Sequence, residues 1–244
     1  ARLTEDDDPQ RAIAALERLA AASPDDVDAA LRLGRLYDRT GRLEQALEWF
    51  ERGVELAPGR ADARRLLGRC LAALDRPGAD EALRASLAIE PRDAATHAAL
   101  GEWLEAHGRH PAALDAYAAA TRLAPDTAAH WAALGRLRLA RSDAAGAVEA
   151  WENAVRLGPG DASARVALGA ALERMGRRSD AEVSYAEAVR VAGDAASTHT
   201  ELARARLAAG DRWGAAEALE RAVAIAPDDV DAREQLVEAS LAVG

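Results

Sequence analysis

Few side chains in this sequence could take part in catalysis. The chain contains 5 histidines, 1 cysteine and 31 basic residues, and every basic residue is an arginine. Without lysine there is neither a phosphate-loop lysine nor a Schiff-base amine. The Gly-x-Ser-x-Gly and His-Glu-x-x-His motifs of hydrolases and zinc peptidases are also absent. We therefore predict no catalytic residue, no cofactor and no metal site, and expect that the chain is not an enzyme.

Two groups of residues have side chains that could bind a metal ion or react, and they need a separate interpretation. His107 and His110 flank an expected turn, with Glu102 and Glu105 one or two helical turns earlier. Such a set could recruit a metal ion, but solvent-exposed turn residues are the simpler interpretation. The lone thiol of Cys70 excludes an internal disulfide. It replaces a small residue in an expected helix, which predicts a buried filler.

The composition favours helix and excludes several partners. Alanine is abundant and aromatic residues make up only 4%, a balance that favours helix over strand. The net charge of −10 argues against nucleic acid and anionic membranes as general partners. The sequence contains no run of 18 apolar residues, so no segment is predicted to insert into a membrane. Arginine without lysine points to a GC-rich, bacterial genome. The default expectation for localisation is the cytoplasm. The periplasm is the alternative, if a signal peptide has been removed from the chain.

Two sets of residues recur in step along the chain. The Leu-Gly pairs are Leu33-Gly34, Leu67-Gly68, Leu100-Gly101, Leu134-Gly135 and Leu168-Gly169, and Leu202-Ala203 follows at the same spacing. The prolines that close each unit are Pro58, Pro91, Pro125, Pro159 and Pro227, with Gly193 standing in once. Self-similarity at this period predicts stacked copies of one supersecondary unit.

Each unit is predicted to be a pair of helices joined by a short turn. Residues 27–39 carry small or apolar residues on one helical face, at Ala30, Leu33, Gly34 and Tyr37. Thr40-Gly41 interrupts this pattern, because glycine suits a left-handed helix end. Residues 43–56 resume it until Pro58. Neither helix can bury its apolar stripe alone, so each must stack on its neighbours.

Period and motif together resemble the tetratricopeptide repeat, whose signature is W-x2-L-G-x2-Y, then A-x3-F, then P. Repeat one supplies Leu33, Gly34, Tyr37, Ala46, Phe50 and Pro58, and repeat four supplies Trp131, Leu134, Gly135, Ala147, Trp151 and Pro159. The resemblance covers essentially the whole chain. It implies an all-α fold: a right-handed α-solenoid (superhelix) of stacked antiparallel helix pairs, with about 14 helices.

We divide this single solenoid, residues 1–244, by the same register. Six full repeats span 27–60, 61–93, 94–127, 128–161, 162–195 and 196–229. Residues 1–26 form a partial repeat, with Leu3 in the place of Tyr37 and a full second helix at 9–22. Residues 230–244 form the first helix of a further or capping repeat. Because residues 230–243 present Leu236, Val237, Leu241 and Val243, we expect a longer parent protein, with natural capping helices as the alternative.

Some signature positions hold unusual residues. Repeat two is one residue short near Pro77-Gly78. His97 and His199 occupy the position of Trp131 and are predicted to be packing substitutes. Trp103 is expected on the packing side. Trp49 and Trp213 fall outside the signature, where a second contact surface is the alternative to ordinary exposure.

In proteins that this chain resembles, the remaining stripe of each first helix lines a concave groove for peptides or helices. The candidate partner-binding residues on that stripe are Leu31, Arg35, Arg65, Arg69, Arg136, Leu139, Val166, Arg204 and Leu207. They predict an acidic and apolar ligand, steered by arginines and anchored by aliphatic side chains. Solvated surface arginines are the alternative. The lysine and asparagine of the family's carboxylate clamp are absent, since repeat one has Leu31 and Arg35 there.

The resemblance implies a protein–protein interaction scaffold or adaptor that binds a protein or peptide segment in this groove. Two other functions stay open. The chain could be a self-assembling structural scaffold, associating through its terminal helices at 9–22 or 230–243. It could also be the recruiting arm of a larger enzyme, or of a secretion or envelope complex. Fold alone does not choose among the three.

Overall fold

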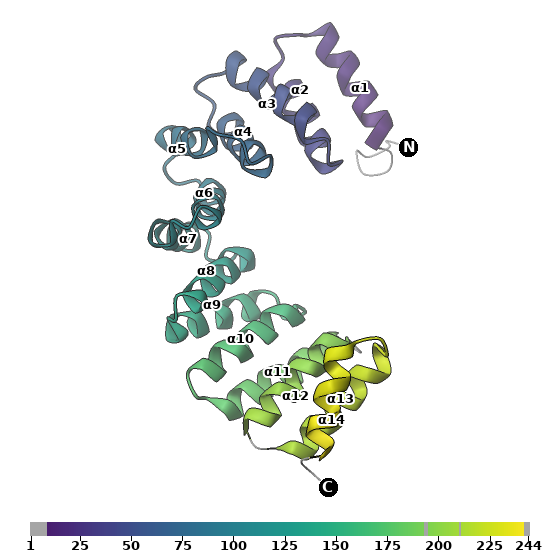
Figure 1. Ribbon diagram of the computed structural model, residues 1–244. Coiled ribbons are helices and arrows are strands. Elements are labelled where there is room, and N and C mark those ends of the chain that lie inside the picture. Colours follow the sequence, from purple (N-terminus) through teal and green to yellow (C-terminus); the bar gives the residue numbers. More distant parts are fainter. Residues whose placement is uncertain (1–8, 193–194, 210, 242–244) are drawn as a thin grey trace. The chain divides into compact units, whose positions relative to one another are not determined.

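The computed structural model describes residues 9–192, 195–209 and 211–241, which form 14 α-helices and no strand (Figure 1). The first helices of the repeats are α2 (Val27–Arg39), α4 (Ala61–Ala73), α6 (Ala94–Ala106), α8 (Ala128–Ala140), α10 (Ala162–Arg174), α12 (Ala196–Ala209) and α14 (Val230–Leu241). The second helices are α1 (Pro9–Ala22), α3 (Leu43–Leu56), α5 (Ala79–Ile89), α7 (His110–Leu123), α9 (Ala144–Leu157), α11 (Arg178–Ala192) and α13 (Arg212–Ile225). The predicted all-α class and helix number are confirmed. The expectations for Leu3, Gly193 and Val243 lie outside the described residues.

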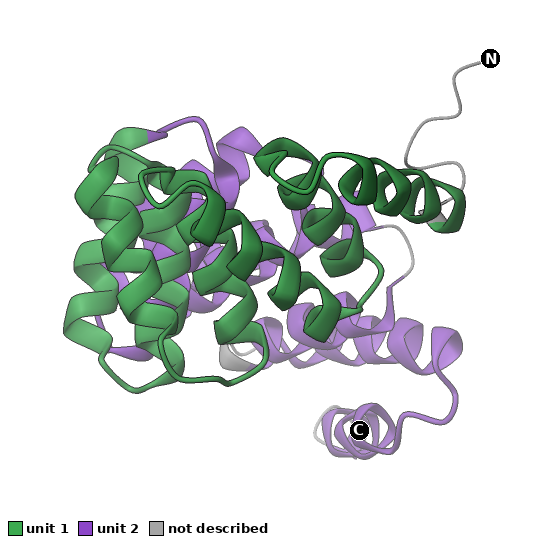
Figure 2. Ribbon diagram, turned by 90° about the horizontal axis from the view of Figure 1, so that it is seen from above, with its two compact units in different colours: residues 1–123 green, residues 124–244 purple. Residues whose placement is uncertain are grey.

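Contacts between helices group the chain into two compact units, residues 1–123 and residues 124–244 (Figure 2). The first unit contains α1–α7 and the second contains α8–α14. Within each unit every helix packs on the next one along the chain, and several first helices also touch the first helix that follows, as α2 touches α4 and α10 touches α12. This is the packing of an α-solenoid, in which each helix pair buries its apolar face on its neighbours.

Residues in the left-handed conformation follow the ends of α2, α4, α6, α8 and α10. After α2, Gly41 has φ 74°, and the amide of Arg42 donates to the carbonyl of Tyr37 at 2.9 Å. This closure satisfies a carbonyl that the helix end leaves without a partner, and it confirms the predicted turn at Thr40-Gly41. The equivalent residue after α4 is Asp75, at φ 52°, and after α8 it is Ser142, at φ 65°.

The recurring glycines of the Leu-Gly pairs are explained by aromatic rings that lie on the backbone of the first helices. A Cβ placed on Gly34 would be 2.6 Å from the ring of Phe50. The same close approach joins Gly101 to Tyr117, Gly135 to Trp151 and Gly169 to Tyr185, at 2.7 to 2.9 Å. Only glycine leaves room for this contact, so the glycine and the ring form one packing unit in each of these four repeats.

Repeats two and six use a smaller version of the same contact. Leu83 replaces the ring and lies 2.7 Å from a Cβ built on Gly68. In repeat six Ala203 replaces the glycine, and Leu219, at the position of the ring, is also fully buried in the same core cluster. Repeat two has the short second helix α5, of 11 residues, which begins after Gly78 at φ 91°. The predicted loss of a residue at Pro77-Gly78 therefore shortens the second helix, whereas the turn before it, residues 74–78, is longer than the turn 40–42 after α2.

All three tyrosines of the chain donate to a glutamate. The hydroxyl of Tyr37 lies 2.5 Å from Glu17, that of Tyr117 lies 3.0 Å from Glu105, and that of Tyr185 lies 3.0 Å from Glu173. Each ring is at most 5% exposed. A buried phenol must find a hydrogen-bond partner, and these glutamates supply it.

Candidate partner-binding site

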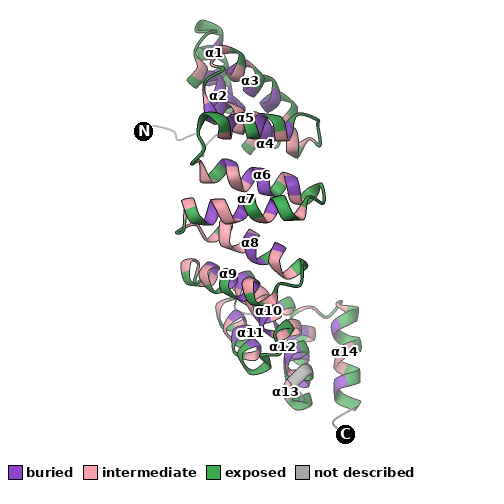
Figure 3. Cartoon of the chain, turned by 90° about the vertical axis from the view of Figure 1, so that its left-hand side faces the viewer, coloured by how far each residue is buried: buried purple, intermediate pink, exposed green. Residues whose placement is uncertain are grey.

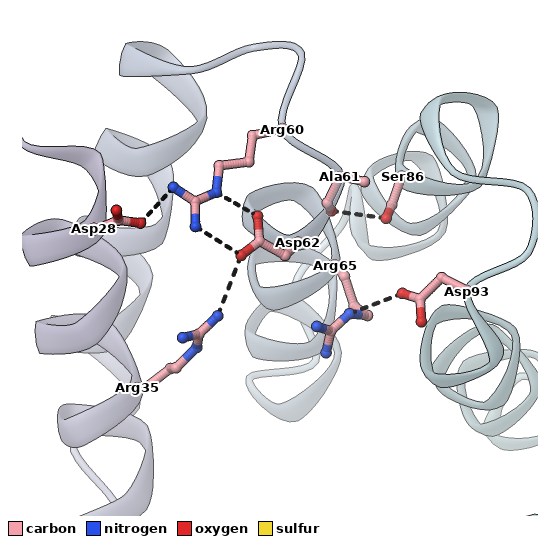
Figure 4. A network of polar contacts seen from close by, with 8 residues as sticks. All are labelled: Asp28, Arg35, Arg60, Ala61, Asp62, Arg65, Ser86 and Asp93. Atoms are coloured by element: carbon pink, nitrogen blue, oxygen red, sulfur yellow. Dashed lines mark hydrogen bonds and ion pairs between the residues drawn. The ribbon is translucent and has the colours of Figure 1, made fainter.

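Most arginines of the predicted row are already paired within the protein. In the first unit, Arg35 lies 3.3 Å from Asp62 and Arg65 lies 3.1 Å from Asp93 (Figure 4). Arg60 joins the same network, with Asp28 at 2.6 Å and Asp62 at 2.7 Å. Arg35 and Arg60 link repeat one to Asp62 of repeat two, and Arg65 links α4 to Asp93, the residue that caps the start of α6. The aspartates therefore neutralise much of the positive charge that the sequence places on this stripe.

The Asp62 carboxylate shows how strongly this network holds its charge. Burial alone would raise the pKa of Asp62, but the hydrogen bonds from Arg60, and the charges of Arg60 and Arg35, lower it below its ordinary value. Beside the network, the hydroxyl of Ser86 on α5 donates to the carbonyl of Ala61 at 2.8 Å (Figure 4). The start of α4 is thus tied to its neighbours on both sides.

Arg69 is different from the other arginines of the row in the first unit. It is exposed on α4 and makes no hydrogen bond or ion pair with any residue that the structure describes. In the second unit, Arg204 lies 2.6 Å from Glu201 and 3.4 Å from Glu173, while Arg136 is exposed on α8. Arg69 is therefore the member of the first-unit row whose charge is available to a ligand.

The predicted aliphatic anchors are placed unequally. Leu31 is only 1% exposed, and its Cδ2 lies 2.5 Å from a Cβ built on Gly53, so it fills the space that this glycine leaves. The interpretation of Leu31 as a groove anchor is wrong, because a core side chain has no surface to offer. Leu139 and Val166 are partly buried against the core of the second unit, and Leu207 is 37% exposed.

A hollow of about 340 Å³ lies between α4 and α6, beside Arg69. Its lining residues are Arg69, Ala72, Ala73, Asp75, Ala99, Glu102, Trp103, Ala106 and His107. Arg69 and Glu102 hold the same repeat position on successive first helices. The alanines leave space between them, so that the hollow lies on the stripe where the resemblance places the groove.

An aromatic stack forms one wall of this hollow. The rings of Trp103 and His107 stack with centroids 4.1 Å apart and planes 24° apart. A ring nitrogen of His107 lies 2.8 Å from the carbonyl oxygen of Trp103, and the guanidinium of Arg109 lies 5.4 Å from the Trp103 ring centre. These contacts hold a flat aromatic surface in place, as a binding surface requires. The hollow thus combines an unpaired cation with a pre-positioned apolar wall.

Sequence reasoning missed Trp103 and His107 as site residues. Trp103 was expected on the packing side, but it is only partly buried and lines the hollow. The available signal was their spacing of four residues, which places two rings on the same helical face. The small residues Ala72 and Ala106 were a second signal, since alanines on neighbouring helices leave a recess.

Two further histidines, His97 and His199, serve the fold. A ring nitrogen of His97 lies 3.0 Å from the Pro91 carbonyl oxygen, and Trp131 donates to the Pro125 carbonyl at 2.9 Å. This equivalence confirms that His97 substitutes for the signature tryptophan, and His199 is buried at 7% exposure. Among the residues described, no group of three or more histidine, cysteine or acidic side chains is arranged to hold a metal ion.

We expect Cys70 to be unreactive in the folded protein. It is 3% exposed, and its thiol donates to the Leu43 carbonyl at 3.3 Å. Burial, together with the charges of Asp38 and Glu44, raises the pKa of the Cys70 thiol to about 11. Because the thiolate is the reactive form, a disulfide reagent at pH 8 should modify the folded chain at least about tenfold more slowly than the denatured chain. Equal modification rates for the folded and the denatured chain would contradict this. The variant Cys70→Ser, which has no thiol, is the control.

Comparison with known proteins agrees with the fold and the repeats. Two tetratricopeptide repeat family models match, over residues 3–70 and 132–197, and together they cover more than half of the chain. The chain belongs to the tetratricopeptide repeat family. Such proteins are generally non-catalytic scaffolds for protein–protein interaction. None of the helices in the described ranges is both long enough and apolar enough to cross a membrane.

Several solved structures are similar to this chain. PilF of Pseudomonas aeruginosa is 25% identical, with a TM-score of 0.72 over 87% of this chain and 97% of that chain. The C-terminal part of a repeat protein from Cytophaga hutchinsonii is 15% identical, with a TM-score of 0.73 over 93% and 94%. YrrB, described as a repeat protein with an unusual peptide-binding site, is 18% identical, with a TM-score of 0.56 over 90% and 96%. No curated protein matches the sequence.

Proposed function

We propose that this chain is an interaction scaffold that binds a segment of a partner protein along the exposed stripe of its first helices. In this proposal the hollow between α4 and α6 receives an acidic and apolar part of that segment. The observation that carries it is the unpaired guanidinium of Arg69 beside the stacked rings of Trp103 and His107. YrrB, which has a similar fold and is described with a peptide-binding site, supports the proposal.

The available energies require both parts of the hollow. An exposed ion pair contributes roughly 0–1 kcal/mol, whereas micromolar binding needs about 8 kcal/mol. Arg69 can therefore orient an acidic group but cannot hold the ligand alone. Most of the affinity must come from apolar groups that cover Trp103 and the alanines around it. We infer a ligand with a carboxylate next to an aromatic or aliphatic side chain.

The ion pairs of the other arginines restrict which of them can attract the ligand. A ligand that used Arg35 or Arg65 would have to displace Asp62 or Asp93 from its ion pair. It would gain one ion pair and lose another. Within the first unit, charge attraction is therefore local to Arg69 and does not extend to Arg35 and Arg65 as the sequence predicted.

The experiment selects ligands from a library of random peptides displayed on phage, with the full chain as bait. We expect the selected peptides to carry Asp or Glu beside an apolar residue. Arg69→Glu should weaken binding of these peptides by at least about tenfold, which is 1.4 kcal/mol, and Trp103→Ala should weaken it further. Titration calorimetry measures both effects.

The control is Arg18→Glu, which makes the same change of charge at an exposed arginine of α1 outside the hollow. It should leave the affinity within about twofold of the wild-type value. Peptides that bind Arg69→Glu and Trp103→Ala as tightly as the wild-type chain would refute the proposed site. Affinity capture from a lysate, run with the wild-type chain and Arg69→Glu in parallel, then separates specific partners from background.

A further inference from the structure

A recess of about 410 Å³ lies in the second unit, lined by residues of the second helices α9 and α11 and of the first helix α10. Figure 3 shows these three helices next to one another, with buried and exposed residues interspersed along α11. The aliphatic part of the lining consists of Val155, Leu168, Leu172 and Val183. We call this surface the Val183 recess, because its most exposed aliphatic residue is Val183.

Val183 is aliphatic at a repeat position that is otherwise acidic. It is 64% exposed on α11. The other five repeats hold an exposed carboxylate at this position, namely Glu48, Glu81, Asp115, Glu149 and Glu217. Packing between repeats therefore does not require an apolar residue here. A single exposed aliphatic residue is common on protein surfaces, so its significance depends on what lies beside it.

The floor of the Val183 recess is more open than in most repeats. Arg165 stands at the position of Trp131, whose side chain packs against the core in repeat four. A guanidinium nitrogen of Arg165 donates to the carbonyl of Asp161, before the start of α10, at 3.5 Å. Leu168 is only partly buried, whereas the equivalent leucines of four other repeats are at most 6% exposed, namely Leu33, Leu100, Leu134 and Leu202.

Repeat two has only one of these two features. It carries an arginine at the same position, Arg64, and its leucine, Leu67, is also only partly buried. It keeps Glu81, however, at the position of Val183. Among the repeats in the described ranges, repeat five joins a partly exposed leucine to an aliphatic wall. Contiguous apolar surface, unlike a single exposed residue, marks contact with another molecule.

The charged residues around the recess leave one carboxylate free. Arg177 lies 2.6 Å from Asp180, and Glu187 lies 2.7 Å from Arg190. Glu152, exposed on α9, makes no hydrogen bond or ion pair with any residue that the structure describes. The net charge of −10 adds a general attraction for basic partners. A ligand that fits this recess therefore places a cation beside an aliphatic group.

We propose that the Val183 recess is a second docking site, which binds a basic and aliphatic segment of a partner protein. An aliphatic side chain of that segment covers Val183 and Leu168, and a lysine or arginine beside it pairs with Glu152. Apolar contact supplies most of the affinity, since an exposed ion pair adds little. The charge preference is opposite to that of the hollow beside Arg69, so the two sites select different segments. This inference does not depend on the hollow being a binding site.

The test selects ligands from random peptides displayed on phage, with the full wild-type chain as bait. The library is first depleted on Val183→Glu, which removes peptides that bind any other surface, including the hollow beside Arg69. Val183→Glu restores the residue type of the other five repeats, so it keeps the fold, and circular dichroism verifies this. The enriched peptides carry Lys or Arg beside Leu, Ile or Val.

Titration calorimetry of the selected peptides measures what each part of the recess contributes. Val183→Glu weakens binding at least about tenfold, which is 1.4 kcal/mol, although its added negative charge by itself favours a basic peptide. Glu152→Arg weakens binding by about three- to fivefold, as the loss of an exposed ion pair implies. The matched control is Glu51→Arg, the same change at the same repeat position on α3 in the first unit. It leaves the affinity within about twofold of the wild-type value.

Three outcomes overturn the proposal. The first is that depletion on Val183→Glu leaves no peptide that the wild-type chain enriches. The second is a set of enriched peptides without basic residues, or with affinities that Glu152→Arg does not change. The third is a dimer, seen by sedimentation velocity, that Val183→Glu abolishes, which assigns the recess to a second copy of the chain. Arg69→Glu leaves the affinity of these peptides unchanged, so this proposal and the proposed function can fail separately.

Discussion

Phe50→Ala is expected to lower the free energy of unfolding of the first unit by about 3–5 kcal/mol. The Phe50 ring is 1% exposed and lies on the backbone of α2 at Gly34, so its loss leaves a cavity between α2 and α3. The surroundings cannot close this cavity easily, because the two helices are also held by the stacks on either side. Chemical denaturation followed by circular dichroism measures the loss. Trp213→Ala is the control, since Trp213 is 75% exposed, and it should change stability by less than about 0.5 kcal/mol.

A companion pair of variants tests the mechanism of this packing. Gly34→Ala alone should destabilise the unit, because its Cβ would lie 2.6 Å from the Phe50 ring. In a Phe50→Leu background the same change should be tolerated, since repeat six combines Ala203 with Leu219 at the same positions. A double-mutant cycle measures the coupling. Additive effects would show that the glycine and the ring do not form one packing unit.

Alkaline pH is expected to destabilise the fold through its tyrosines. Burial, followed by the hydrogen bond to Glu17, raises the pKa of Tyr37 from its ordinary value of 10.0 to about 12. Burial and the charge of Glu173 raise the pKa of Tyr185 as well. A raised pKa means that the folded state favours the neutral phenol. The stability from Tyr37 is therefore fully present below pH 10 and is lost as the pH rises towards 12.

Thermal unfolding midpoints across this pH window test the expectation. Cys70 titrates in the same range, so the comparison uses a Cys70→Ala background. There the midpoint should fall steeply as the pH rises from about 10 to 12. Replacing the three tyrosines by phenylalanine should flatten this dependence, although stability near neutral pH is lower because three hydrogen bonds are removed. An unchanged slope would mean that other groups control alkaline unfolding.

Neutralised arginines change how the surface of this scaffold can be used. The sequence shows a row of positive residues on an acidic chain, but Arg35 is paired with Asp62 of the next repeat, and Arg65 is paired with Asp93, which caps the start of α6. These pairs hold the repeats in register and leave Arg69 for a ligand.

The helices, their pairing and the family follow from the sequence by itself. Proline at position 58, glycine at position 41 and the apolar spacing within residues 27–39 act over one or two turns of chain, and the period repeats them. Local signals of this kind are sufficient to place helix ends, as the bounds of α2 and α3 confirm. The stripe of candidate binding residues was also predicted from the sequence, as what remains after the packing face is assigned.

Only the tertiary structure decided which residues on that stripe can bind. Leu31 is buried because Gly53, on another helix, leaves room for it. Arg35 is neutralised because Asp62 approaches from the next repeat, whereas no described acidic group reaches Arg69. Trp103 faces a hollow because α4 opposite presents alanines. Each of these outcomes depends on distances between side chains of different helices. The repeat period determines which face a residue occupies, but only the packing of neighbouring helices sets those distances.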